Sequence, residues 1–109
     1  MDIKKVYDIL SECARDWASD ADWFDHMHAP SLSELYRFGQ KAICDFIEAA
    51  RSEDFKTVDE IGELLDKLQY DIWNMYKVYQ DDHFDHLAEL WRYAYTALCD
   101  AENAIERNK

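Results

Sequence analysis

The sequence predicts an all-α protein, an antiparallel four-helix bundle built from two duplicated helical hairpins. Its 109 residues include two Gly and one Pro, too few for the many turns of a β-sandwich. The stretch Leu32–Ala50 (LSELYRFGQKAICDFIEAA) also recurs as Leu87–Ile105 (LAELWRYAYTALCDAENAI), with eight identities at a constant offset of 55 residues. Such a repeat indicates one supersecondary unit written twice. We therefore expect a single domain, with one hairpin over about 3–51 and the other over about 57–107.

The first helix is predicted from Ile3 to Ala18, with Asp2 as its N-cap. Its apolar residues alternate in steps of three and four, which is typical of one buried helix face. They are Ile3, Val6, Leu10, Cys13 and Trp17. Residues 19–31 (SDADWFDHMHAPS) are interpreted as a connection, because Pro30 disfavours a helical conformation in the residue before it.

The second helix is predicted over about 32–51, after a capping box formed by Ser31 and Glu34. It carries two apolar stripes and is therefore expected to contact two neighbouring helices. Gly39 lies in its interior, where glycine costs about 1 kcal/mol relative to alanine. We expect a close approach of another helix there, and the repeat places the small residue Ala94 in the equivalent position of the second hairpin.

The third helix is predicted from Val58 to about Tyr79, and Thr57 with Glu60 forms a second capping box. Its apolar stripe runs without a break from Val58 to Tyr79. After a short connection at 80–83, the fourth helix is predicted from His83 to about Glu106. Four helices with short connections favour an up-down-up-down bundle.

A second similarity joins Asp22–His26 (DWFDH) to Asp82–His86 (DHFDH). Taken with the first repeat, it predicts a five-residue insertion at 27–31 in the first hairpin. In an up-down-up-down bundle, the first and third connections lie at the same end. We expect this end, the acidic pole, to collect all four histidines of the chain: His26, His28, His83 and His86.

The charge of the chain is strongly negative, with 24 acidic and 12 basic residues and a net charge of −12. Nucleic-acid and anionic membrane surfaces require Lys and Arg for binding, so both are excluded as direct ligands. Residues 16–36 and 78–91 together contain nine acidic residues and no Lys or Arg. The predicted acidic pole therefore accounts for most of the net charge.

Three roles compete for this pole. The first is helix capping by Asp22, Asp25, Asp82 and Asp85, which leaves Asp20 and Asp81 unexplained because they follow predicted helix C-termini. The second is a metal site that joins His26 and His86 to neighbouring aspartates, although the sequence contains no established metal-ligand spacing. The third is a recognition surface for a basic protein.

We interpret the pole as a partner-binding surface and expect no cofactor and no resident metal. The expected contact residues are Asp20, Asp22, Trp23, Asp25, Asp81, Asp82 and Asp85. Tyr and Trp beside charged residues are typical of protein-binding hot spots. The expected partner is a basic, nucleic-acid-handling protein, bound in a way that mimics nucleic acid. The alternatives are a metal-binding bundle and a homodimeric scaffold.

Catalysis finds little support in the sequence, so we expect a regulator or inhibitor and not an enzyme. There is no glycine-rich phosphate loop and no Gly-x-Ser-x-Gly turn. Cys13, Cys44 and Cys99 form no Cys-x-x-Cys pair and lie on helical patterns, so we expect reduced core thiols. With no secretory signal pattern and no long apolar run, the expected location is cytoplasmic.

Overall fold

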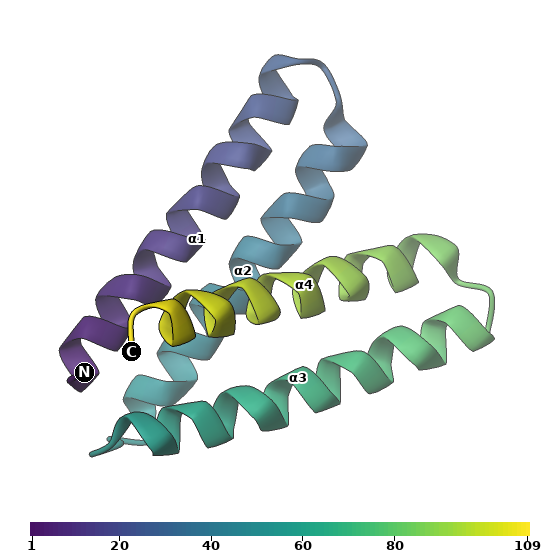
Figure 1. Cartoon of the computed structure of the whole chain (residues 1–109). Coiled ribbons are helices and arrows are strands. Elements are labelled where there is room, and N and C mark those ends of the chain that lie inside the picture. The colour runs from purple at the N-terminus through teal and green to yellow at the C-terminus, as the bar shows by residue number, and fades with distance from the viewer.

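The computed structural model covers residues 1–109 and contains four helices and no strand. The helices are α1 (Ile3–His26), α2 (Pro30–Ser52), α3 (Val58–Asp81) and α4 (Asp85–Arg107). The predicted fold class is confirmed: α1 pairs with α2, α3 pairs with α4, and the two hairpins pack into a bundle (Figure 1). No helix combines the length and apolar character that crossing a membrane requires.

The two hairpins cross each other through α2 and α4, which form the main contact between them. α1 also packs on α4, whereas α3 touches α2 only along a short stretch. Figure 1 shows the α1–α2 and α3–α4 connections at the tips of two diverging arms, and both chain termini near the α2–α3 connection. The prediction that these two connections lie together at one end of the bundle is therefore wrong, because they form two separate tips.

Side-chain size explains why the arms diverge. At the crossing, a Cβ added to Gly39 would lie 3.2 Å from Cβ of Ala97, so small residues let α2 approach α4 closely. Nearer the tips the facing residues are aromatic, and the rings of Phe38 and Trp91 meet edge to face with centroids 5.2 Å apart. Small residues at one point and large rings beyond it hold the helices at an angle.

The core lies at the base of the arms, where residues from all four helices are buried. Its most buried large side chains are Val6, Leu10, Ile43, Phe46, Ile61, Leu65 and Leu98. In α3, only Ile61 and Leu65 are fully buried, and Met75 on the same predicted stripe is exposed. The apolar stripe therefore predicted which face of α3 points inward. Because the arms diverge, that face is left uncovered in the half of α3 that is nearer the tip.

The internal repeat holds an offset of 55 residues along the whole chain. α1 and α3 begin at Ile3 and Val58, and α2 and α4 begin at Pro30 and Asp85. The predicted five-residue insertion is therefore wrong, as is the pairing of His26 with His86. Residues 22–26 belong to the last turns of α1, whereas residues 82–86 span the connection and the first turn of α4.

The α1–α2 and α3–α4 connections share one backbone design. His28 and His83 have φ angles of 59° and 61°, in the left-handed region. The amide of Ala29 donates to the carbonyl of Phe24 at 2.8 Å, and the amide of Phe84 donates to the carbonyl of Tyr79 at 2.9 Å. This six-to-one bond is the Schellman motif, which satisfies carbonyls left free at a helix C-terminus.

Three predicted helix boundaries differ from the structure. α1 continues to His26, so most of the predicted connection is helical; Ala21 is fully buried there, and Phe24 stacks on Tyr36. α2 begins at Pro30 after Ala29 with no side-chain cap, and α4 begins at Asp85 after Phe84, again without one. The predicted capping box at Ser31 is therefore absent, because Ser31 is the second residue of α2 and the N-cap position belongs to Ala29, which has no polar side chain.

The other two helix starts agree with prediction. The Asp2 carboxylate accepts a hydrogen bond of 2.7 Å from the Lys5 amide. Thr57 and Glu60 form the predicted capping box, in which each side chain bonds to the backbone amide of the other residue. These caps lie where the sequence contains a polar residue directly before an apolar helical pattern.

Candidate functional site

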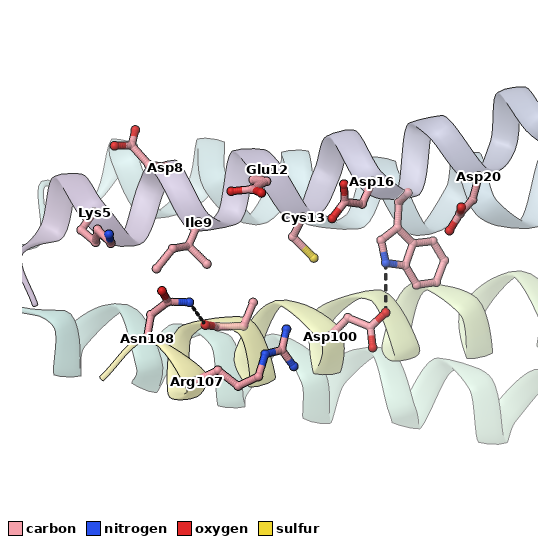
Figure 2. Close-up of a pocket in the computed structure, with 12 residues that line it drawn as sticks. Lys5, Asp8, Ile9, Glu12, Cys13, Asp16, Asp20, Asp100, Arg107 and Asn108 are labelled. Atoms are coloured by element: carbon pink, nitrogen blue, oxygen red, sulfur yellow. Dashed lines mark hydrogen bonds between the residues drawn. The ribbon is translucent and has the colours of Figure 1, made fainter.

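An acidic groove of about 560 Å³ runs between α1 and α4. Four exposed carboxylates line it along α1 at every fourth residue: Asp8, Glu12, Asp16 and Asp20. This spacing places them on one helix face, about 6 Å apart along the axis. Asp100 of α4 lies across the groove (Figure 2). The only basic residues in the lining are Lys5 and Arg107.

The floor of the groove is formed partly by Trp17 and Cys13, both buried. The indole Nε1 of Trp17 donates a hydrogen bond of 3.1 Å to Oδ2 of Asp100, which ties α1 to α4. Burial, with the nearby charges of Asp100 and Asp16, raises the pKa of the Cys13 thiol to about 11. Cys13 is therefore a protonated thiol at neutral pH and a poor nucleophile.

A second groove, about 360 Å³ in volume, lies on the other side of α4 and separates it from α3. Its acidic lining residues are Asp59, Glu63, Asp66, Glu102 and Glu106. Burial raises the pKa of Glu102, and the neighbouring carboxyls of Asp66 and Glu106 raise it further. Like-charged groups are thus held close together at this position.

The charge is unevenly distributed over the helices. α2 carries three acidic and three basic residues, whereas α1, α3 and α4 together carry seventeen acidic and seven basic residues. Because the two acidic grooves flank α4, the surface formed by α1, α4 and α3 is the acidic face of the molecule. Figure 1 views these three helices with α2 behind α4.

The predicted site residues of the first hairpin separate into two groups. Asp20 lines the acidic groove, while Asp22 and Asp25 bind the Arg37 guanidinium of α2. Hydrogen bonds from Ser33 and Arg37 lower the pKa of Asp25. Trp23 is 58% exposed. Asp22 and Asp25 thus tie α1 to α2 near the C-terminus of α1, and the predicted capping role for them is wrong.

The predicted site residues of the second hairpin lie at the other tip. Asp81 is the last residue of α3, Asp82 is its C-cap, and Asp85 is the first residue of α4. All three are exposed. Only Asp85 lies where the helix dipole favours a carboxylate. The structure does not bring these residues into the acidic groove with Asp20.

The four histidines lie in or next to the α1–α2 and α3–α4 connections. His28 and His83 are the left-handed residues of the turns, and Nε2 of His86 lies 3.2 Å from Oε1 of Glu34. His26 ends α1, with its ring centroid 6.5 Å from that of Trp23. No three His, Cys, Asp or Glu side chains converge in a geometry that could hold a metal ion.

The predicted contact residues do not include Asp8, Glu12, Asp16 and Asp100, which supply four of the five carboxylates of the acidic groove. The first three were detectable, because acidic residues every four positions align on one helical face. Asp100 was not detectable, since only the packing of α1 on α4 places it opposite the other carboxylates.

The repeat relates the acidic groove to an apolar groove on the other side of the molecule. This groove, of about 380 Å³, lies between α2 and α3 over α4. Leu68 and Ile72 line it at the positions equivalent to Cys13 and Trp17, and Asp45 lines it at the position equivalent to Asp100. Equivalent places in the two hairpins therefore carry different chemistry.

Comparison with protein-family models, curated proteins and solved structures finds no match to this chain.

Proposed function

We propose that this chain is a non-catalytic protein-binding module whose acidic face binds a basic protein. The observation that carries the proposal is the row Asp8, Glu12, Asp16 and Asp20, which faces Asp100 across one groove. None of these five carboxylates forms an ion pair within the chain. Their charge is therefore available to attract cationic side chains.

Basic proteins that bind nucleic acid present Lys and Arg to a row of phosphates. A row of carboxylates on a rigid helix offers such a surface an alternative set of anionic contacts. The proposal therefore extends to a regulator or inhibitor that competes with nucleic acid for its partner. The acidic face would speed the encounter and make binding sensitive to salt.

Charge reversal tests this proposal. We expect the double variant D8K/D16K to lose at least tenfold in affinity for a lysine-rich peptide, and for a basic partner captured from the native host, at low salt. The matched control is E48K/E53K, which changes the net charge equally but away from the acidic face. Equal losses in both double variants, or a wild-type complex that persists unchanged in ~1 M salt, where the screening length is about 3 Å, would overturn the proposal.

A homodimeric scaffold is the second candidate, and the apolar groove favours it. Phe38, Phe46 and Trp91 are among nine apolar residues that line this groove. It borders α2, the helix without net charge, so two copies meeting there would avoid most of their mutual repulsion. Sedimentation of wild type and of A42E tests this candidate. A wild-type chain that stays monomeric at ~1 mM, a concentration at which even a weak dimer forms, would exclude it.

A further inference from the structure

The acidic groove continues at one end into a hollow of about 290 Å³, which we call the aromatic hollow. Three residues line both spaces: Trp17, Asp20 and Asp100. The hollow adds Tyr36 from α2, and Arg92, Tyr93 and Thr96 from α4. Figure 2 shows Asp20 and Asp100 approaching from the two helices at the end of the groove away from Lys5.

The three aromatic rings of the hollow pack against one another. The ring centroids of Trp17 and Tyr36 are 5.1 Å apart, those of Tyr36 and Tyr93 are 5.4 Å apart, and those of Trp17 and Tyr93 are 6.4 Å apart. Trp17 is buried, and both tyrosines are half-buried. The rings are therefore a fixed wall and not mobile surface side chains.

The polar groups that line the hollow are the Asp20 and Asp100 carboxylates, the two tyrosine phenols, the Thr96 hydroxyl and the Arg92 guanidinium. Burial raises the pKa of the Tyr36 phenol, and Tyr93, Asp20 and Asp100 raise it further. These influences indicate that the phenol oxygens and the two carboxylates lie near one another. Neither carboxylate has an ion-pair partner within the chain.

The chain itself shows that a guanidinium group fits against this wall. The Arg92 guanidinium carbon lies 5.1 Å from the ring centroid of Tyr93. Its charge is already balanced, because Nε and Nη2 of Arg92 donate to the carboxylate of Glu89 at 2.9 and 2.8 Å. Arg92 therefore leaves Asp20 and Asp100 free to receive a second cation.

We propose that the aromatic hollow is the anchor site for an arginine side chain of the basic partner. This proposal rests on the proposed function, which it makes more specific. A guanidinium has five N–H donors in a plane, so it stacks on an aromatic ring and bonds to carboxylates at its edge. An ammonium is a compact, strongly hydrated charge that satisfies the carboxylates but stacks less well.

Titration with octa-arginine and octa-lysine peptides tests the anchor site. At low salt, we expect wild type to bind octa-arginine about fivefold more tightly than octa-lysine, as one desolvated guanidinium–aromatic contact predicts. Y93L and D20N should each reduce this preference to the small preference for arginine that exposed carboxylates alone produce. The affinity of Y93L for octa-lysine should equal that of wild type. The matched control D8N removes a carboxylate from the same row but outside the hollow, so it should weaken both peptides equally.

The outcomes separate the two proposals. If neither peptide binds wild type, the proposed function fails and the anchor site fails with it. If both bind and the arginine preference is the same in wild type, Y93L and D20N, the anchor site is wrong while the proposed function stands. Far-UV circular dichroism verifies that each variant is folded, and D20N changes an exposed side chain, so it keeps the test informative if Y93L is unstable.

Discussion

Gly39 of α2 lies directly against the indole ring of Trp17 in α1. A Cβ added to this glycine would lie 2.5 Å from Cζ3 and 2.6 Å from Cε3 of that ring. The same ring donates its N–H to Asp100 of α4. The absence of a side chain at Gly39 therefore lets Trp17 occupy the position from which its indole N–H bonds to Asp100, on the α4 side of the acidic groove.

The first prediction concerns this contact. We expect G39A to lower the free energy of unfolding by about 1–3 kcal/mol, because the rigid indole must shift inside a packed core. This expected loss is the net value, after the gain of about 1 kcal/mol that alanine brings to a helix interior is taken into account. The matched control is G62A, whose Cβ would meet nothing within 4 Å. It should stabilise the protein by about 0.5–1 kcal/mol. Urea unfolding measures both, and equal signs for the two variants would contradict the prediction.

The second prediction concerns the left-handed residue of the α3–α4 connection. His83 has a φ angle of 61°, a conformation that costs a residue with a Cβ about 1–2 kcal/mol. We expect H83G to be more stable than H83A by about 1 kcal/mol in thermal unfolding, since glycine adopts this conformation without strain. The same comparison at His28 should give the same sign. If the glycine variants prove less stable than the alanine variants, the assignment of these turns is wrong.

The third prediction concerns the cysteines, which differ in exposure although all three were expected in the core. Cys13 is buried and has a pKa raised to about 11, whereas Cys44 is exposed and Cys99 is half-buried. We expect a thiol reagent at pH 8 to label Cys44 first, and to label Cys13 only as fast as the protein unfolds. Peptide mass spectrometry over a time course identifies the order. Early labelling of Cys13 in folded protein would refute it.

The fourth prediction concerns pH. The pKa of Glu102 is raised in the folded state, so the folded protein binds a proton at this carboxyl more tightly than the unfolded chain does. Its contribution to stability is therefore complete at low pH and is lost as pH rises through the raised pKa. We expect E102Q to be more stable than wild type at pH 7 by about 0.2–0.5 kcal/mol, the size typical of screened surface charges. The difference should shrink towards pH 4.

The matched control for that experiment is E12Q. Glu12 is exposed and lies between Asp8 and Asp16 in the row along α1, away from the carboxyls between α3 and α4. A pH-dependent gain in E12Q as large as that in E102Q would mean that net charge, and not the neighbours Asp66 and Glu106, is responsible.

Local sequence patterns were reliable wherever neighbouring residues decide the structure. Asp2 and Thr57 cap their helices as expected, because a cap needs only a polar side chain and the amides three residues later. The prediction took Pro30 as a sign that no helix continues through this region, and so placed a connection over residues 19–31. A proline at the first helical position marks the start of a helix equally well, and the burial of Ala21 that extends α1 depends on tertiary contacts.

The sequence by itself determined four helices, their order and the offset of 55 that relates the two hairpins, because these follow from periodicity along the chain. It also determined the excess of acidic residues. Only the tertiary structure decided where that excess acts. Small residues at the crossing of α2 and α4, with rings beyond it, separate the two tips and bring α1 onto α4. Because Asp20 and Asp100 are 80 residues apart, no local pattern could place them in one groove.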